Sequence, residues 1–283
     1  MLKSRRKNRS PIVTFIIFLF LAIIGVFMML PMVYAVMSSF KPLEELFIFP
    51  PRFFVRKPTL QNYKDLGYLI SNLWVPFERY LYNTAYTSVV STFLYLIIAS
   101  LAAYPLAKHK FFGQKTISET ITLALMFTPA VIELPRYVIM AKLGLIDSFG
   151  AVIFPGLSST MGVYLIINFL NSLPDSIIES ARIDGAREYR IWWTIIMPNI
   201  RPAIMTVLIF QFQGAWNNTA ANYLFSEELK MLPTAVSQIA SAGIARSGVG
   251  SAGSVLMMIP PILIFIISQS RVMETMAHSG MKD

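Results

Sequence analysis

The sequence predicts an all-α, polytopic membrane protein with six transmembrane helices. Hydrophobic residues make up 55% of the 283 residues and charged residues only 14%, a balance far from that of soluble domains. Five runs contain no Asp, Glu, Lys or Arg: residues 10–40, 80–107, 148–174, 202–226 and 247–270. Each run exceeds the roughly 20 residues that cross a bilayer. Lipid offers no hydrogen-bond partners to the backbone, so these segments should be helices.

The first helix, from Pro11 to about Ser39, would exceed about 40 Å at roughly 1.5 Å per residue, so we expect it to tilt or protrude. It is too long for a signal peptide and lacks a small-residue cleavage pattern, which favours a retained helix. The tail before it is basic: Lys3, Arg5, Arg6, Lys7 and Arg9. A basic tail beside the first span favours the cytoplasmic side. With six spans, both termini are then cytoplasmic, and the net charge of +9 requires no nucleic acid.

Residues 41–79 are predicted to form an external, irregular segment. The segment is polar and contains five prolines, which oppose a regular helix: Pro42, Pro50, Pro51, Pro58 and Pro76. The sequence therefore divides into residues 1–79, which hold the tail, the first helix and this segment, a transmembrane core at 80–271, and a cytoplasmic tail at 272–283.

The cytoplasmic turn 108–115 is followed by Thr116, and the pair Lys115-Thr116 superficially suggests a phosphate-binding loop. The first glycine and the adjacent Gly-Lys pair of that motif are absent, so we expect no nucleotide site in this chain. The third span, about 116–140, is interrupted by three charges, Glu119, Glu133 and Arg136.

Charges at membrane depth are costly and often mark a pathway. Glu133 and Arg136, at i and i+3, could pair on one helix face although Pro135 intervenes. Two interpretations stay open. Both charges lie at the outer interface just beyond the span, or they line the outer mouth and contact an anionic or heavily hydroxylated sugar.

Residues 177–202 look like neither a membrane span nor a disordered loop. They are expected to form two short helices, the first capped by Ser172 and the second starting after Gly185 in a left-handed conformation. After that glycine, apolar residues recur at helical spacing and predict one apolar face: Tyr189, Trp192, Trp193 and Ile196.

The spacing of Glu179, Ala181, Gly185, Ile195 and Pro198 resembles the EAA loop of ABC importer permeases. Asp184 and Ala186 extend the resemblance toward the carbohydrate-uptake branch, whereas Ser180 and Met197 depart from the pattern. Segments such as Ser39-Phe40-Lys41 resemble the shorter, maltose-permease-like subunit of that branch, and the resemblance covers nearly the whole chain.

The resemblance implies a type I ABC importer transmembrane fold in a bacterial cell membrane. Its loop, at 175–198, would dock on a separate ATPase subunit. The residues expected to couple to that subunit are Glu179, Ala181, Asp184, Gly185, Ala186 and Pro198. The resemblance also implies three kinds of partner: a second permease, two copies of the ATPase, and an extracytoplasmic solute-binding protein. The ATPase copies would hold ATP and Mg, and the binding protein would deliver a sugar or oligosaccharide.

The fifth span, from Pro202 to about Phe225, contains amides and an indole that suit sugar hydroxyls and pyranose C–H faces. The candidate pathway residues there are Gln211, Gln213, Trp216, Asn217 and Asn218. Such residues also hold neighbouring membrane helices together, and that alternative stays open. Residues 226–254 should form an external segment before the last span, about 255–270, and residues 241–254, which are rich in small side chains, should be flexible.

No constellation of catalytic residues is present, so we expect no enzyme activity and no metal site. His109 and His278 lie far apart in the sequence, without metal-ligand spacing, and His109 is expected to be solvated on its turn. The chain contains no cysteine. The alternatives are an ABC permease for a non-carbohydrate solute, a polytopic membrane enzyme, and a 175–197 loop that merely lies on anionic lipid. The net negative charge of 175–190 disfavours the last.

Overall fold

The computed structural model describes residues 11–71 and 75–279, and within these ranges it contains helices, turns and no strand. The described residues divide into two compact units. Unit 1 holds residues 11–68 and 239–256, and unit 2 holds the remainder. An all-α fold is therefore confirmed.

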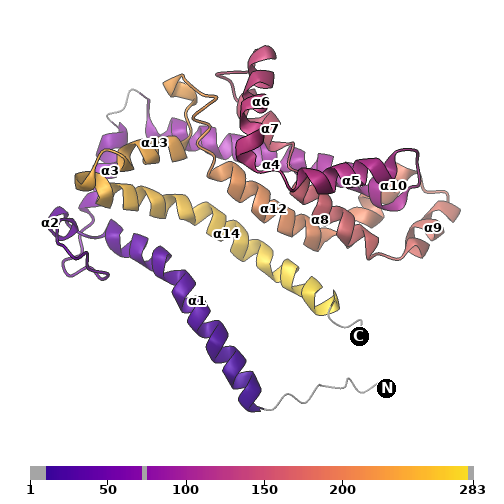
Figure 1. Cartoon of the computed structure of the whole chain (residues 1–283), viewed down its shortest axis with the longest axis horizontal. Helices are drawn as coiled ribbons and strands as arrows, with labels where there is room; N and C mark the ends of the chain where they lie inside the picture. Colours follow the sequence, from indigo (N-terminus) through magenta and orange to yellow (C-terminus); the bar gives the residue numbers. More distant parts are fainter. Residues whose placement is uncertain (1–10, 72–74, 280–283) are drawn as a thin grey trace. The chain divides into compact units, whose positions relative to one another are not determined.

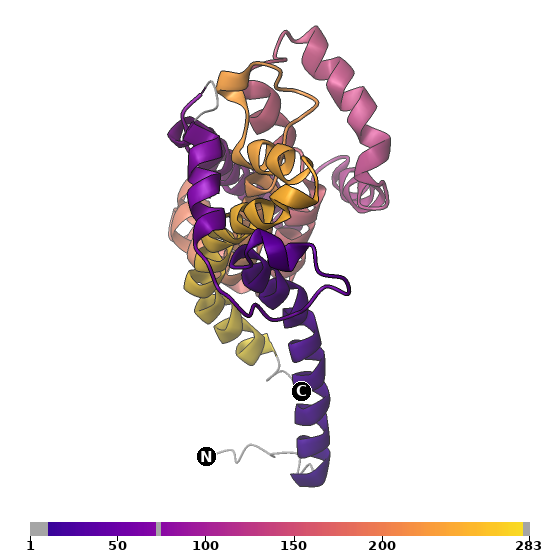
Figure 2. The same cartoon turned by 90° about the vertical axis from the view of Figure 1, so that its left-hand side faces the viewer.

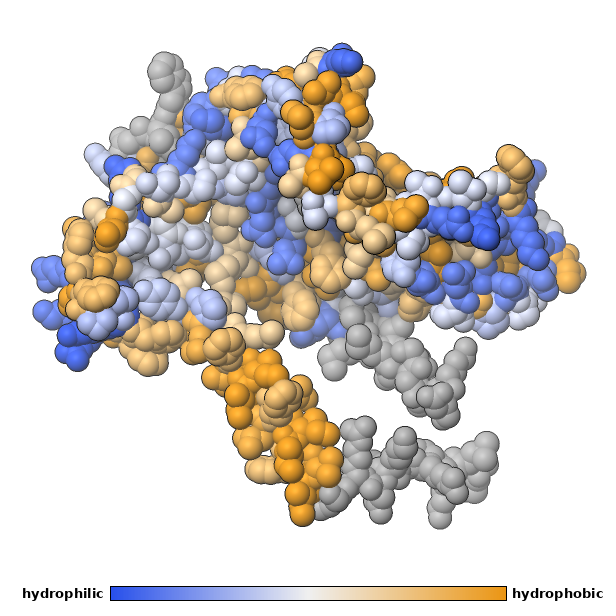
Figure 3. Space-filling model, in the orientation of Figure 1, coloured by the Kyte–Doolittle hydropathy of each residue, from blue (hydrophilic) through white to orange (hydrophobic). Residues whose placement is uncertain are grey.

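Unit 1 is dominated by α1 (Pro11–Ser39), which Figure 2 shows as one long helix that leads into an extended loop. Its surface is hydrophobic along its length (Figure 3), and its apolar window has no buried residue. A helix that is apolar on all sides is typical of a membrane span. The smaller elements of this unit are α2 (Leu43–Leu46), η3 (Ile244–Arg246) and most of α3 (Gln61–Ser71).

The chain that follows α1 folds back on itself around Asn62. The amide of Asn62 donates to the carbonyl oxygens of Ser39, at 2.9 Å, and of Lys41, at 2.8 Å. Gly248 leaves room for this amide, because a Cβ there would lie 2.6 Å from Asn62 Oδ1. The prediction that 41–79 is irregular is wrong for α3. The stretch between Pro58 and Pro76 contains no proline to interrupt it.

Unit 2 is organised around α4 (Phe77–Lys108), a helix of 32 residues. It packs against α7 (Gly150–Gly156), α8 (Thr160–Asn171) and α12 (Arg201–Trp216), as Figure 1 shows. In the same view α5 (Gln114–Ala124) runs along α8, whereas α6 (Pro129–Lys142) turns away from it. The other elements are η2 (Glu227–Leu229), most of α13 (Leu232–Ala240) and the second part of α14 (Ser247–Ser279).

The buried face of α4 consists largely of small polar residues: Asn83, Thr84, Thr87, Ser88, Ser91, Thr92 and Ser100. Several of their hydroxyls donate to carbonyls one turn earlier, such as Thr87 Oγ1 to the Asn83 oxygen at 2.8 Å. Bonding within the helix allows a hydroxyl to be buried without a partner from another helix. Small side chains also let the neighbouring helices approach closely.

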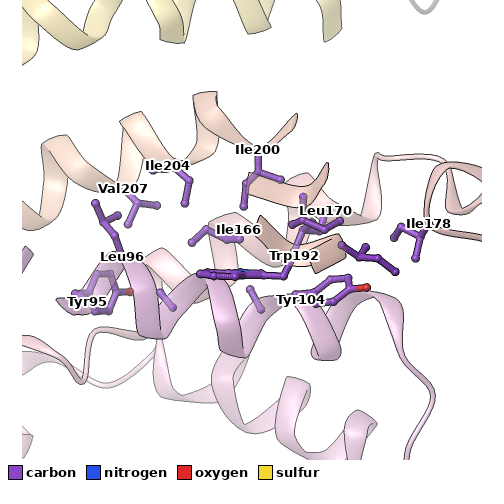
Figure 4. Packing of buried hydrophobic residues seen from close by; sticks show 14 of the residues in the cluster. Tyr95, Leu96, Tyr104, Ile166, Leu170, Ile178, Trp192, Ile200, Ile204 and Val207 are labelled. Atoms are coloured by element: carbon purple, nitrogen blue, oxygen red, sulfur yellow. The ribbon is translucent and has the colours of Figure 1, made fainter. Parts of the chain in front are cut away.

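Among the described glycines of unit 2, Gly162 on α8 has the most crowded surroundings. A Cβ there would lie 2.3 Å from Tyr95 Oη and 2.8 Å from Val207 Cγ1. Tyr95 and Val207 belong to a hydrophobic cluster that joins α4, α8 and α12, and Trp192 lies among these helices (Figure 4). The cluster extends to Ile178, so it ties the helices of the core to residues 175–198.

Four helical segments among the described residues are long and apolar enough to cross a membrane: Ile12–Ser39, Phe77–Lys108, Gly150–Asn171 and Ile244–Gln269. A bent pair, Glu188–Asn199 with Arg201–Trp216, is a fifth candidate. The chain is thus a multi-pass membrane protein. The predicted span 116–140 is not one helix: α5 and α6 are separated by residues 125–128, just before Pro129. Six spans remain a prediction.

Candidate functional site

The elbow, residues 175–198, contains α9 (Asp175–Ile183), α10 (Glu188–Ile191), the π-helix η1 (Trp192–Ile196) and most of α11 (Met197–Asn199). The first helix ends as predicted, with Gly185 at φ +77°. The Ala186 N–H donates to the Ala181 oxygen and the Gly185 N–H to the Arg182 oxygen, each at 3.0 Å. This pair of bonds defines a Schellman motif, in which a left-handed glycine terminates the helix.

The start of α9 differs from the prediction. Ser172 does not cap it; Pro174 stands at that position, and the Ser172 hydroxyl donates to the Phe169 oxygen at 2.7 Å. Ser172 instead ends α8. A proline before the helix and Asp175 in its first turn provide a start without a side-chain cap.

The second half of the elbow widens into a π-helix, in which the Met197 N–H bonds to the Trp192 oxygen. Pro198 has no N–H to continue an α-helical ladder, and the Asn199 amide reaches back to the Ile195 oxygen at 2.7 Å. A bend of 79° follows before α12. Proline and a π-bulge are the usual causes of such a kink.

The prediction of one apolar face at 189–196 is wrong in part. Trp192 and Ile196 are buried, but Tyr189 is 73% exposed and Trp193 58% exposed. The spacing argument assumed 3.6 residues per turn, whereas the π-helix has i→i+5 bonding and shifts the register. Ile191 takes the buried position instead.

One face of the elbow packs against the other helices of unit 2, and the other face is exposed to solvent. Ile178 and Ala181 on α9 are buried in the hydrophobic cluster, and Ala186 packs against it. The other predicted coupling residues lie on the exposed face: Glu179, Asp184, Gly185 and Pro198. Beside them, Ile183 is 86% exposed. Tyr189 and Trp193 are exposed too, so three large apolar side chains of the elbow face solvent in the single chain.

Glu188 binds the elbow to α4. Its carboxylate accepts from Tyr104 Oη at 2.7 Å, from Arg182 Nε at 2.8 Å, and lies 3.1 Å from His109 Nε2. The hydrogen bond from Arg182, with smaller contributions from Tyr104 and His109, lowers the pKa of Glu188. We call this cluster of four side chains the clamp.

A second contact joins the elbow to the C-terminal end of α4. Lys108 Nζ, at the end of α4, donates to the Leu173 oxygen at 2.7 Å and to Asp175 Oδ1 at 2.6 Å. The ammonium group of Lys108 lowers the pKa of Asp175. The start of α9 is therefore held to the end of α4.

The clamp residues were not identified from the sequence. His109 was expected to be solvated, but its ring packs edge-on against Tyr104, with centroids 5.0 Å apart, and its Nε2 lies 2.9 Å from Arg182 Nη2. The partners lie 73 and 79 residues away in the chain, and no spacing pattern connects them.

Some of the predicted pathway residues lie together in unit 2. Arg136, Gln211 and Asn218 line a cavity of about 560 Å³, with Thr87 and Ser91 of α4 on its wall. Gln211 Nε2 donates to the Gly156 oxygen at 2.7 Å, which leaves its own oxygen available.

The other predicted pathway residues are elsewhere. Trp216 is buried, stacks on Phe212 and donates to the Met257 oxygen at 3.0 Å, so it joins α12 to α14. Gln213 and Asn217 are exposed and do not line the cavity. The predicted span 202–226 also ends early, because α12 stops at Trp216.

Glu133 and Arg136 do not pair in the described structure. Glu133 Oε1 accepts from Asn222 Nδ2 at 2.7 Å and lines a different hollow, with Tyr137 and Phe225. Among the described residues, no group of His, Cys, Asp and Glu could hold a metal ion.

A multi-pass helical protein with a solvent-facing elbow at one end of its core and a polar cavity between its helices belongs to the class of membrane transport subunits. The sequence profile of the binding-protein-dependent transport system inner membrane components matches residues 96–276. The chain belongs to this family, whose members transport solutes and are not enzymes.

Curated relatives match over most of the chain. The arabinooligosaccharides transport system permease protein AraQ of Halalkalibacterium halodurans is 27% identical over 98% of this chain and 99% of its own length. Protein LplC of Bacillus subtilis is 33% identical over 71% of this chain and 65% of its own length. The sulfoquinovosyl glycerol transport system permease protein SmoH of Agrobacterium fabrum is 27% identical over 89% and 88%.

A solved structure has the same fold. It is described as a bacterial ABC transporter involved in the import of the acidic polysaccharide alginate. The match has a TM-score of 0.75 at 22% identity and covers 95% of this chain and 99% of that one. The predicted type I importer fold is confirmed.

Proposed function

We propose that this chain is one half of the transmembrane pore of an ATP-driven carbohydrate importer in a bacterial cell membrane, with both termini in the cytoplasm. The similarity to AraQ and SmoH supports a sugar or oligosaccharide as the solute. The hydroxyl and amide groups of the cavity suit such a solute. The family name supports delivery by a solute-binding protein. A second permease completes the pore.

The elbow is the contact for a separate ATPase, present in two copies, that binds ATP and Mg. The observation that carries this proposal is the elbow's two-sided construction. Its inner face is held to α4 by hydrophobic packing and by the clamp, whereas its outer face exposes Ile183, Tyr189 and Trp193. Exposed apolar area of this kind is stabilised when a partner covers it, at about 25 cal/mol per Å².

On this proposal the predicted coupling residues fall into two groups. Glu179, Asp184, Gly185 and Pro198 face the ATPase. Ala181 and Ala186 hold the turn together from within, because they are the two ends of the 3.0 Å Schellman bond. ATP-driven movement of the partner would then move α9 and α4 as one body, and this chain would perform no reaction of its own.

Copurification of the ATPase with two variants of Gly185 tests the proposal. A Cβ at this position meets no atom within 4 Å, so Gly185→Ala and Gly185→Arg carry the same backbone penalty of φ +77°. They differ in bulk on the outer face. We expect the ATPase to copurify with Gly185→Ala and to be lost from Gly185→Arg. Equal recovery with both variants would contradict docking at this turn.

A further inference from the structure

Among its described lining residues, the cavity of unit 2 carries charge of one sign only. Its wall contains one cation, Arg136, and no Asp or Glu. The remaining polar groups are neutral: Thr87, Ser91, Ser158, Ser159, Thr160, Gln211 and Asn218. The cavity therefore carries one positive charge and many neutral hydrogen-bonding groups.

The charge of Arg136 is not neutralised by its neighbour on α6. Glu133 is directed to Asn222 and to a separate hollow, and Arg136 forms no salt bridge with any residue that the structure describes. A cation that is partly withdrawn from water and has no anionic partner is costly to maintain. An anionic ligand in the cavity would remove that cost.

The wall beside Arg136 is a break between two helices. α7 ends at Gly156 and α8 begins at Thr160, within a segment that is apolar enough to span the membrane. Irregular backbone at such a depth is tolerated where it lines a polar cavity.

The polar groups at the break between α7 and α8 also favour a negatively charged ligand. Gln211 satisfies the Gly156 carbonyl, and Ser159 at the N-cap makes no side-chain bond to the first turn of α8. The Ser159 oxygen accepts from Tyr95 Oη at 2.6 Å, so two carbonyl acceptors of the break are already used. A helix N-terminus favours negative charge, so it adds to the preference set by Arg136.

Asn218, which also lines the cavity, offers further donors for a negative group. The Asn218 oxygen is already used by the Ala220 N–H, at 2.9 Å, which leaves its amide N–H groups as donors. Gln211, with its oxygen available, can accept from a sugar hydroxyl. The cavity can hold an acidic group and neutral hydroxyls at the same time.

We infer that the cavity is a subsite for an acidic carbohydrate, one that carries a carboxylate or sulfonate, and that Arg136 binds that group. The inference rests on the proposed function and narrows it to a substrate class. A planar guanidinium binds a carboxylate through two parallel hydrogen bonds, whereas a neutral sugar offers it only weaker acceptors.

The test uses the complete transporter, with its partner permease, ATPase and binding protein, in proteoliposomes. The probes are a labelled galacturonate disaccharide and the neutral galactose disaccharide obtained by reduction of its carboxylates. Uptake of each is measured with Arg136→Gln, with Arg136→Lys and with Lys142→Gln. Lys142 is an exposed cation on the same helix and does not line the cavity.

We expect the wild type to import the acidic disaccharide in preference to the neutral one. Arg136→Gln should raise KM and lower kcat/KM for the acidic probe by about tenfold or more. Arg136→Lys should recover part of the lost activity, because lysine keeps the positive charge but lacks the two parallel N–H donors of the guanidinium group. Lys142→Gln should leave uptake unchanged. Lys142→Gln should also leave basal ATP hydrolysis unchanged. Equal recovery of the assembled transporter with every variant would show that all of them are folded and assembled.

Three outcomes would overturn the inference: preferential import of the neutral disaccharide, equal import of both, or undiminished import of the acidic one by Arg136→Gln. Any of these, with ATP-dependent uptake of a sugar intact, leaves the proposed function standing. Absence of ATP-dependent uptake of either sugar, in a transporter that hydrolyses ATP and imports another kind of solute, would overturn both.

Discussion

At the scale of single residues, Glu188 is the main electrostatic link between the elbow and α4. Its carboxylate is half exposed, so its hydrogen bonds are screened by water and contribute less than buried ones would. The pKa of Glu188 lies below its usual value near 4.5 because Arg182, first among its neighbours, stabilises the charged form. A carboxylate with a lowered pKa stabilises the fold above its usual pKa, and that stabilisation is lost as the pH falls through the folded value.

Glu188→Gln should lower the free energy of unfolding by about 1 kcal/mol at pH 7. The difference from the wild type should begin to shrink as the pH falls below about 4.5, and it should vanish below the lower folded pKa, where the wild-type carboxylate is protonated too. Thermal unfolding of the detergent-solubilised protein at several pH values measures both. Glu179→Gln is the matched control, since that exposed carboxylate makes no hydrogen bond among the described residues. A loss of equal size at acidic and neutral pH would contradict the electrostatic origin.

Local patterns could be predicted at this scale, and distant contacts could not. Gly185 was correctly expected to be left-handed, because the small residues and the helix end around it are local in sequence. His109 was wrongly expected to be solvated. Its contacts depend on how the end of α4 meets α10, and one sequence contains no signal for that meeting.

At the scale of elements, the packing of α8 on α4 and α12 depends on Gly162. A side chain at this position would overlap Tyr95 and Val207, and both come from helices that cannot easily move apart. The helix-breaking tendency of glycine is outweighed here by close approach.

Gly162→Ala should destabilise the protein by about 1–3 kcal/mol, although alanine favours a helix, because the core is overpacked. Gly67→Ala on α3 is the control: its Cβ would meet nothing within 4 Å, and it should be neutral or stabilising. Unfolding midpoints of the two variants provide the comparison. Equal behaviour of the two variants would mean that α8 is not packed as closely as the structure shows.

Helix boundaries explain the main errors of prediction at this scale. Composition correctly predicted membrane helices for α1 and α4. It did not predict the break before Pro129, the π-helix in the elbow or the early end of α12 at Trp216. Each of these interrupts an apolar segment, and hydropathy averaged over a span does not resolve such interruptions. A side chain's partner on another helix is equally invisible to hydropathy: the indole of Trp216 donates to the Met257 oxygen of α14.

At the scale of the whole molecule, the chain is a transport subunit that depends on a separate ATPase subunit for energy. The family, the all-α fold and the type I architecture agree with what the sequence predicts. The proposed role of the elbow rests on its exposed apolar side chains, and that of Arg136 rests on the charge of the cavity.

The most direct test of the central claim is the accessibility of the elbow. The chain contains no cysteine, so Ile183→Cys introduces a single thiol at a position that is 86% exposed. The account predicts that a membrane-impermeant maleimide labels this thiol in inside-out vesicles of the permease pair alone, and that assembly with the ATPase protects it. Labelling from the outside of intact cells, or equal labelling with and without the ATPase, would contradict it.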